Sequence, residues 1–387
     1  MLMNKRKICV VVTARPSYAR IKTVLSAIQN HPSLELQLVL AGSALLSRYG
    51  DVSKTIEKDG FSIVERIYNV IEGESPTSMA KTTGMAIMEL STVFYNLKPD
   101  IVVTIADRFE TIATSIASSY QNIPLAHIQG GEVTGNIDEK VRHANTKLAD
   151  IHLVASNDAM QRVIKMGENK DMVINTGCPS MDLAREVFLC PELDFDPIIK
   201  YGGVGGNINW KNGYIVVMQH PVTTEFKKSK AHIEETLRAV SELNIPTFWF
   251  WPNVDAGSDG TSNGIRGYRE NNDTSNIHFF KNMEPDDFLR LIINSKCLVG
   301  NSSVGIRESA FLGVPVVNIG SRQNRRQRAS NVVDCEYSKN DIKNSIEFQL
   351  KNTRYDSEHI YGDGYAGKKI ANILAKIDLI FHKTIVY

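Results

Sequence analysis

Two stretches of the sequence concentrate side chains of the kind that transfer protons, ADRFE and HIQGGEVTGNIDEKVRHA. Carboxylates that meet at one edge of a sheet can serve as general acid and general base on a carbon atom or a leaving group. Glu139 and Arg142 have instead the spacing of an ordinary exposed ion pair on a helix, so we assign them no chemical role. The candidate residues of these stretches are Asp107, Arg108, Glu132, Asp138 and His143.

Two further apolar runs end in polar residues. MQHPVTTE places His220 directly after a run that predicts a strand, where an imidazole can contact a phosphate or the oxygen of a leaving group. FWPNVDAG places Asn253 and Asp255 in a similar position after another run. Because the carboxyl ends of parallel strands share one edge of a sheet, we expect these side chains to face a common cleft.

The first of two candidate anion sites follows the first apolar run. TARPSYAR places Arg15 and Ser17 at the start of a predicted helix, where backbone N–H groups and a guanidinium attract phosphate. A surface arginine beside a turn is the alternative interpretation of Arg15. The segment lacks the GxGxxG pattern, which argues against a standard NAD site.

The second candidate anion site is LVGNSSVGIRE. Its small residues Ser302, Ser303 and Gly305 allow a diphosphate to approach the amino end of the following helix, where the helix dipole favours negative charge. Ser302 would cap that helix whatever it binds. Glu308 lies about one and a half turns into the helix. Its carboxylate can accept hydrogen bonds from both hydroxyls of a ribose, or it is an exposed helical glutamate.

Alternating strands and helices must position these motifs. In the N-terminal half, short β-branched runs alternate with amphipathic stretches such as 19–30 and 77–97, which predicts a parallel, doubly wound α/β sheet. The predicted strands are Ile8–Thr13, Leu36–Ala41, Ile101–Ile105, Leu125–Gln129 and Ile151–Ala155.

The same alternation resumes after a polar, glycine-rich stretch, which predicts two Rossmann-like domains with a central cleft. The predicted domains cover residues 1–189 and 213–367, with a linker over 190–212 and a closing C-terminal helix over 368–387. The strands predicted for the second domain are Tyr214–Met218, Thr247–Trp251, Ile277–Phe280, Cys297–Val299 and Val314–Ile319, and its helices lie near His232–Leu243, Pro285–Ser295 and Arg307–Leu312.

Composition limits the classes of partner. A net charge of +1 over 387 residues gives no electrostatic ground for binding nucleic acid or an anionic membrane. No segment approaches the roughly 20 apolar residues of a membrane span, and the apolar run near the start is too short for a signal peptide. The five cysteines have no spacing suited to zinc, so we expect free thiols, no metal and a cytoplasmic protein.

The motifs, taken in order along the chain, resemble those of the hydrolysing UDP-N-acetylglucosamine 2-epimerases, including bacterial enzymes of sialic acid biosynthesis. The matching motifs are TARPSYARIK, ADRFE, HIQGGEVTGNIDEKVRHANTKL, TGCPSMD, QHPVTTE, PNVDAG, GNSSVGIRE and YGDG, which span nearly the whole chain. The resemblance implies a GT-B fold whose second domain holds the nucleotide, a homodimer or homotetramer, and no cofactor. It also implies elimination of UDP across C1 and C2 to a 2-acetamidoglycal, followed by hydration to N-acetylmannosamine.

The resemblance assigns roles to individual residues. Asp107 and Asp138 match the family's acidic catalytic residues, and His220 matches its histidine on the phosphate side. Gln129 stands where the resemblance implies a carboxylate, and an amide does not exchange a proton at neutral pH. Either Glu132 takes that role, or the chain belongs to a branch with altered chemistry or substrate. The residues that match UDP contacts are Arg15, Arg108, Ser302, Ser303, Glu308 and Arg322.

Four alternatives stay open at this point. The same reaction on UDP-N,N'-diacetylbacillosamine, on the way to legionaminic acid, is the alternative substrate. A GT-B glycosyltransferase would share the fold but would need an acceptor for the sugar. An inactive nucleotide-sugar sensor is suggested by Gln129 alone. A non-hydrolysing epimerase would keep UDP on its product.

Overall fold

The computed structural model describes residues 5–46, 51–71, 75–105, 108–133, 137–252, 258–379 and 383–386. The chain forms two compact units, of which the first is Met1–Asp182 with Tyr361–Tyr387 and the second is Leu183–Ile360. These bounds differ from those expected from the sequence. Residues 190–212, expected to be a linker, form α8 (Pro197–Tyr201) and β8 (Val204–Gly205) of the second unit.

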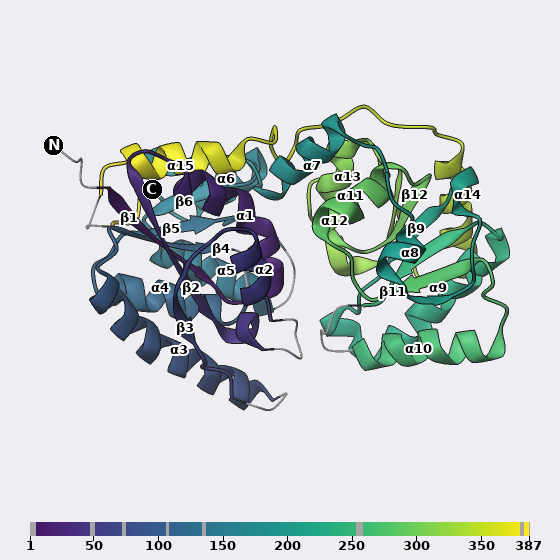
Figure 1. Ribbon diagram of the computed structural model, residues 1–387, viewed down its shortest axis with the longest axis horizontal. Coiled ribbons are helices and arrows are strands. Elements are labelled where there is room, and N and C mark those ends of the chain that lie inside the picture. Colours follow the sequence, from purple (N-terminus) through teal and green to yellow (C-terminus); the bar gives the residue numbers. More distant parts are fainter. Residues whose placement is uncertain are drawn as a thin grey trace. The chain divides into compact units, whose positions relative to one another are not determined.

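The first unit contains a parallel sheet flanked by helices (Figure 1). Among the described residues its strand order is β3-β2-β1-β4-β5-β6-β7. The five strands predicted from the sequence are confirmed to within about two residues at each end. The strands are β1 (Arg6–Val12), β2 (Leu34–Ala41), β3 (Ile63–Ile67), β4 (Ile101–Ile105), β5 (Leu125–Ile128), β6 (Ile151–Val154) and β7 (Val173–Asn175).

Helices cover both faces of this sheet. Val10 and Val12 of β1 pack into a core with α1 and α15, whereas Cys9 and Val11 pack on the opposite face with α3 and α4. A sheet buried on both faces requires strands that are apolar almost throughout, which explains the sequence pattern. The helices are α1 (Arg15–Gln29), α2 (Ser53–Lys58), α3 (Pro76–Leu97), α4 (Thr111–Tyr120), α5 (Ile137–Leu148), α6 (Asn157–Lys165) and α15 (Ala366–Lys376).

The second unit repeats this architecture after α7 (Ser180–Leu189). Its described strands have the order β14-β13-β12-β9-β10-β11-β8, and they are parallel except for β8, which pairs antiparallel with β11. The strands are β9 (Ile215–Met218), β10 (Thr247–Phe250), β11 (Ile277–Phe280), β12 (Cys297–Gly300), β13 (Val316–Ile319) and β14 (Val332–Cys335). The helices are α9 (Ser229–Leu243), α10 (Ser258–Asn271), α11 (Pro285–Ile293), α12 (Ser303–Ile306), α13 (Glu308–Leu312) and α14 (Lys339–Leu350).

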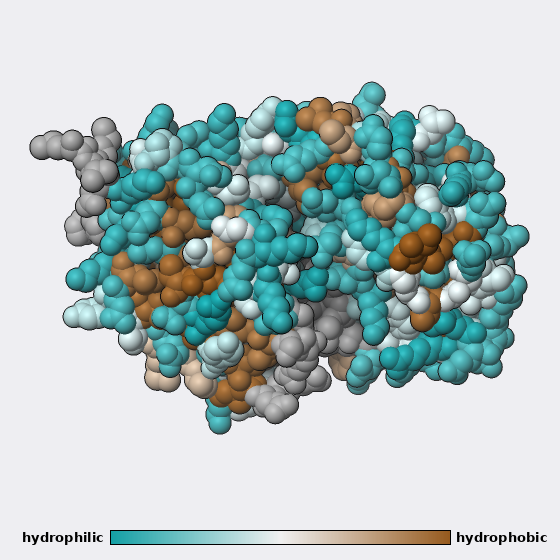
Figure 2. Space-filling model, viewed as in Figure 1, coloured by the Kyte–Doolittle hydropathy of each residue, from teal (hydrophilic) through white to brown (hydrophobic). Residues whose placement is uncertain are grey.

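Most side chains of the apolar strands are buried beneath the surface of the protein. Hydrophilic residues cover much of the face seen in Figure 2, and the apolar residues there form separate groups. No helix within the described ranges is both long enough and apolar enough to cross a membrane.

Candidate functional site

The predicted site residues fall into two groups, one in each unit. In the second unit, His220 follows β9, Ser302 follows β12 and Arg322 follows β13. These three strands are neighbours and parallel in the sheet, so their carboxyl ends meet at one edge. The structure therefore brings these three predicted residues to one place, as the strand order requires.

A tight turn joins β12 to α12. Gly300 has a φ of +133°, and a Cβ at this position would lie 2.1 Å from the carbonyl oxygen of Met218, so only glycine fits. Ser302 caps the helix because its Oγ accepts a hydrogen bond from the N–H of Val304 at 3.4 Å. The predicted cap is confirmed, and it places Ser302 and Ser303 at the turn.

The helix that was expected to run through Glu308 is interrupted. It breaks at Arg307, which has φ −103° and ψ −71°, and Glu308 becomes the first residue of α13. Glu308 is only 6% exposed, so its interpretation as an exposed glutamate is wrong. Arg307 Nη2 donates to Ser303 Oγ at 3.2 Å, and Arg307 Nε lies 3.8 Å from Glu308 Oε2. Glu308 Oε2 is itself buried and accepts no hydrogen bond from the described residues.

His220 is a buried, neutral imidazole. Burial, with a further contribution from the charge of Arg322, lowers the pKa of His220 from 6.5 to about 3. The imidazole therefore carries no charge at physiological pH, although it retains one N–H that can donate a hydrogen bond. Arg322 places a positive charge at this edge of the sheet, and its Nη1 donates to the carbonyl oxygen of Asn301 at 3.2 Å.

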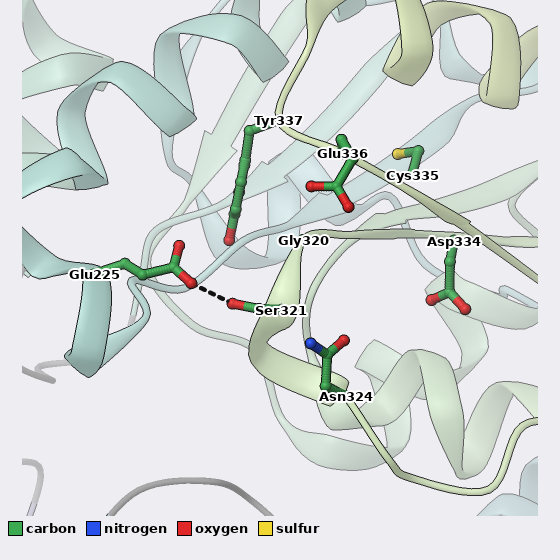
Figure 3. A pocket seen from close by; sticks show the side chains of 8 residues that line it. All are labelled: Glu225, Gly320, Ser321, Asn324, Asp334, Cys335, Glu336 and Tyr337. Carbon is green, nitrogen blue, oxygen red and sulfur yellow. Dashed lines mark hydrogen bonds between the residues drawn. The ribbon is translucent and has the colours of Figure 1, made fainter.

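A pocket of about 310 Å³ lies next to the loop that carries Arg322. Its lining includes Glu225, Ser321 and Tyr337, and Ser321 Oγ donates to Glu225 Oε1 at 2.5 Å (Figure 3). The ring of Tyr337 stacks on His232 with 3.6 Å between ring centroids. Acidic and hydroxyl groups favour ligand hydroxyls over a phosphate here. The sequence prediction assigned a role to none of these lining residues. Glu225 ends the motif QHPVTTE, in which only His220 was singled out, and the segment that ends in Tyr337 has no catalytic pattern.

For four predicted residues the structure does not describe the position of the side chain. Asp107, Asn253 and Asp255 lie outside the described residues. Asp138 belongs to α5, and only its backbone is described. Their chemical roles stay predictions.

In the first unit, two predicted arginines have different surroundings. Arg15 is the first residue of α1 and is half-buried, whereas Ser17 is buried and its N–H donates to the carbonyl of Ala14 at 3.0 Å. Arg15 is therefore the more accessible group for a phosphate. Arg108 Nε donates to Glu110 Oε1 at 2.9 Å, and Glu110 is buried. Glu110 thus orients Arg108, a role that the ADRFE motif did not reveal.

The loop after β5 holds Gln129 and Glu132 in fixed positions. Gln129 has a φ of +66°, which is unusual for a residue other than glycine, and this conformation ends the strand at Ile128. Its side-chain Nε2 donates to Cys178 Sγ at 2.9 Å. Glu132 is 6% exposed. The side-chain amide of Gln129 is therefore hydrogen-bonded to a buried thiol, and Glu132 provides a carboxylate in the same loop.

Arg142 corrects an expectation from the sequence. It is 2% exposed rather than on the surface, and its Nη1 donates to the carbonyl oxygen of Glu132 at 2.8 Å. Glu139 lies instead near His143, one turn further along α5, with 3.4 Å between Oε1 and Nε2. A buried guanidinium thus fixes the backbone that carries Glu132, which the helical spacing alone could not indicate.

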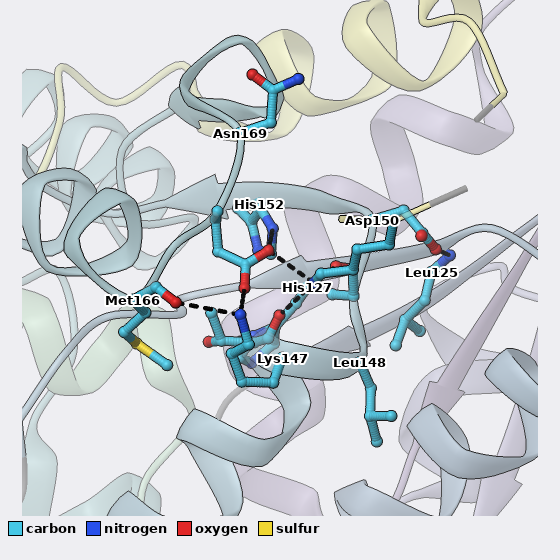
Figure 4. A network of polar contacts seen from close by, with 12 residues as sticks. Leu125, His127, Lys147, Leu148, Asp150, His152, Met166 and Asn169 are labelled. Atoms are coloured by element: carbon cyan, nitrogen blue, oxygen red, sulfur yellow. Dashed lines mark hydrogen bonds and ion pairs between the residues drawn. The ribbon is translucent and has the colours of Figure 1, made fainter. Parts of the chain in front are cut away.

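A second polar cluster in this unit lies at the other end of α5. Glu168 is 3% exposed and accepts from Lys147 at 2.6 Å, from Lys383 at 2.7 Å and from His152 at 3.0 Å. Lys147 and His152 come from α5 and β6 (Figure 4). Burial acts to raise the pKa of Glu168, but the hydrogen bonds from His152, Lys147 and Lys383 outweigh it and lower the pKa to about 2.

Glu168→Gln is expected to reduce the free energy of unfolding by about 2 kcal/mol at pH 7, since it removes the charge that two lysines share. Both lysines reach solvent in part, which keeps the loss below that of a fully buried pair. Because the pKa of folded Glu168 lies below its ordinary 4.5, the stabilisation is present above pH 4.5 and is lost as the pH falls toward 2. Thermal unfolding of both proteins from pH 7 to pH 3 measures it.

Glu242→Gln provides a matched control for that experiment. Glu242 also contacts two lysines, Lys339 at 2.7 Å and Lys343 at 3.4 Å, but all three side chains are solvent-accessible. Water screens such contacts, so little change in the unfolding midpoint is expected. If Glu168→Gln and Glu242→Gln lower the unfolding midpoint equally, the burial of Glu168 does not strengthen its contacts with the lysines.

The fold and the site together define a class of protein. Two Rossmann-like units, the second with a strand-to-helix turn suited to an anion, are characteristic of GT-B enzymes that bind nucleotide sugars. Among solved structures, UDP-N-acetylglucosamine 2-epimerase from Neisseria meningitidis bound to its substrate matches with a TM-score of 0.76 and 19% identity, covering 95% of this chain and 99% of that one. The predicted GT-B fold is confirmed.

Sequence comparison gives the family. The model of the UDP-N-acetylglucosamine 2-epimerase family matches residues 26–375. The chain is 31% identical over 381 residues to the UDP-N,N'-diacetylbacillosamine 2-epimerase (hydrolyzing) of Legionella pneumophila, covering 97% of each. It is 29% identical over 360 residues to a UDP-N-acetylglucosamine 2-epimerase of Neisseria meningitidis, covering 93% and 91%. The chain belongs to the hydrolysing UDP-N-acetylglucosamine 2-epimerase family, as its motifs predicted, and is a UDP-sugar 2-epimerase.

Proposed function

We propose that this protein is a hydrolysing 2-epimerase that converts UDP-N-acetylglucosamine and water to N-acetylmannosamine and UDP. The family match over residues 26–375 supports the class of reaction. The observation that carries the chemistry is the buried Glu132, held at the carboxyl end of β5 by Arg142. It provides an acid or base beside Gln129, which cannot transfer a proton.

The first step is an elimination. A carboxylate removes the proton from C2 of the sugar, the electron pair of that C–H bond forms the C1–C2 double bond, and the C1–O bond breaks with its electrons leaving on UDP. The product is a 2-acetamidoglycal. We assign the proton transfers to Asp107, Glu132 and Asp138, since positioned carboxylates perform such transfers.

The second step is a hydration. Water adds its oxygen to C1 and loses a proton to a carboxylate, while C2 receives a proton on the face opposite to the one that was deprotonated. The sugar leaves with the manno configuration and a free anomeric hydroxyl. The reaction therefore needs a base on one face of the sugar ring, an acid on the other face, and a carboxylate that accepts the proton of water.

The second unit stabilises the leaving group. Arg322 neutralises charge that develops on the diphosphate, and Ser302 and Ser303 lie at the turn where backbone N–H groups can bind it. His220, neutral when no ligand is bound, contributes its N–H as a hydrogen-bond donor. A bound diphosphate raises the pKa of this imidazole, because an adjacent negative charge favours the protonated form.

UDP-N,N'-diacetylbacillosamine is the second candidate substrate. The relative from Legionella pneumophila, which is named for that sugar, matches along 97% of this chain. The reaction at C1 and C2 is the same for both sugars, which differ at C4 and C6. Contacts to C4 and C6 therefore decide the preference.

Proton and phosphorus NMR in deuterated water tests the proposal. The protein is incubated separately with each UDP-sugar and without any acceptor. Free UDP together with a manno-configured sugar deuterated at C2 is the expected result, and the faster reaction identifies the substrate. A product that retains UDP would indicate a non-hydrolysing epimerase. Binding without turnover of either sugar would reject the proposed reaction.

A further inference from the structure

Asn301 connects three segments at the edge of the second sheet. It follows β12 directly and is fully buried. Its N–H donates to the carbonyl oxygen of Met218 at 3.1 Å, which extends the pairing of β12 with β9 by one residue. Beyond that point the two backbones separate, because β12 continues into the turn at Ser302.

The side chain of Asn301 continues the pairing where the backbone stops. The N–H of His220 donates to Asn301 Oδ1 at 2.7 Å, and Asn301 Nδ2 donates to the carbonyl oxygen of His220 at 2.8 Å. A carboxamide has one acceptor and one donor in the geometry of a peptide group, so it can satisfy both backbone groups of His220. Buried backbone groups require such partners.

The backbone carbonyl of Asn301 serves the neighbouring strand. Its oxygen accepts from Arg322 Nη1 at 3.2 Å and from Gln323 Nε2 at 2.8 Å. A single buried residue therefore contacts both His220 and Arg322 and immediately precedes Ser302. Asn301 therefore links the backbone of His220 to the guanidinium of Arg322 and to the turn.

We propose that Asn301 is a positioning residue that holds His220 at a fixed distance from Arg322, so that both face the leaving diphosphate. This inference rests on the proposed epimerase function. Asn301 has no contact with the sugar in this account: its side chain acts through His220, and its backbone carbonyl contacts Arg322. Small displacements of a positioned group reduce turnover strongly, although binding is affected less.

Asn301→Ala tests this role selectively, because the backbone carbonyl that binds Arg322 remains. The expected result is a fall in kcat on the order of 30-fold, with a much smaller change in KM. Adding Asn301→Ala to His220→Ala should cause little further loss, since Asn301 acts through His220. Fully multiplicative losses in the double variant would overturn the proposal.

Asn331→Ala is the matched structural control. Asn331 is also a buried asparagine of this unit, and its Nδ2 donates to the carbonyl of Val314 at 2.7 Å, at the opposite edge of the sheet. Its substitution is expected to lower the unfolding midpoint and leave kcat unchanged. If it reduces kcat as much as Asn301→Ala does, general destabilisation explains the effect. Asn301→Asp, which retains the acceptor for His220 N–H, should give an intermediate kcat and replaces Asn301→Ala if that variant does not fold.

A measurement without turnover separates this inference from the proposed function. If the wild-type protein acts on neither UDP-sugar, the function fails, but UDP can still be titrated while the imidazole signals of His220 are followed by NMR. UDP is expected to shift these signals in the wild type and to shift them far less in Asn301→Ala, although that variant still binds UDP. An undiminished shift would overturn the positioning role of Asn301.

Discussion

Glu132→Gln is expected to lower kcat for the release of UDP by about a thousandfold, because it replaces a positioned acid or base by an amide of the same shape. The backbone contact from Arg142 to residue 132 survives the substitution. The dissociation constant for UDP should stay nearly constant, since the substitution alters none of the predicted nucleotide contacts, of which Ser302, Ser303 and Glu308 lie in the other unit. Steady-state kinetics and calorimetric titration with UDP measure the two quantities.

Glu139→Gln is the control for this experiment. Glu139 is another carboxylate of the same region, but it is more exposed than Glu132 and lies near His143. Its substitution is expected to leave kcat almost unchanged. Wild-type turnover in Glu132→Gln would remove Glu132 from the mechanism and leave the proton transfers to Asp107 and Asp138.

Glu308→Gln is expected to weaken the binding of UDP by about 100-fold. A carboxylate that accepts hydrogen bonds from both ribose hydroxyls contributes about 3 kcal/mol, and glutamine retains only part of this. Glu308 Oε2 is buried without a hydrogen-bond partner among the described residues, so a ribose hydroxyl that reaches it would satisfy it. At saturating substrate kcat should change little, because the ribose is remote from C1 and C2.

Comparison of UDP with 2'-deoxy-UDP makes the test specific to the ribose. The wild-type protein should bind UDP more tightly than the deoxy analogue, and Glu308→Gln should remove most of that difference. Equal preference for UDP in the wild type and the variant would show that Glu308 does not bind the 2'-hydroxyl. The change in affinity would then come from the ion pair with Arg307, which is also buried.

The predicted strands were placed well because each is apolar along most of its length. The strands β3, β7, β8 and β14 were not predicted, since each is very short or carries a charged residue. Ile277–Phe280 and Ile101–Ile105 have the predicted bounds, and β5 is shorter only because Gln129 adopts a positive φ. Three predicted residues that follow described strands were placed correctly for the same reason. His220, Ser302 and Arg322 meet because parallel strands end at one edge.

Helical features that depend on packing were not predictable. The helix α10 has three glycines and reads as a loop, but Gly260 and Gly264 allow α10 to approach α9 closely. A Cβ at Gly264 would lie 2.5 Å from Ile233 Cγ2. The break at Arg307 and the burial of Arg142 are likewise set by surrounding segments. The sequence around Arg307 is compatible with one continuous helix, and the spacing of Glu139 and Arg142 is compatible with an exposed ion pair.

The Asn301 bridge shows why a positioning residue is harder to predict than a ligand contact. Its function depends on the residue beside it in space, His220, which is distant in sequence. Within GNSSVGIRE, the serines and glycines attract attention because they suit an anion, and an asparagine between strand and helix suggests an ordinary cap. Only the strand order reveals that its amide completes the pairing of β9 and β12.

The segment that returns to the first unit has a consequence for biosynthesis. Ile370, Ala371 and Leu374 of α15 belong to the same core as β1 and α1, and Asp182 accepts hydrogen bonds from the N–H groups of Ala366 and Gly367 at 2.7 Å. These residues are translated after the entire second unit. The N-terminal part of the nascent chain therefore waits for its last core helix while the second unit, contiguous in sequence, can already fold. Because the chain is synthesised from its N-terminus, the second unit is expected to finish folding before the first. This order holds although most of the first unit precedes the second in the sequence.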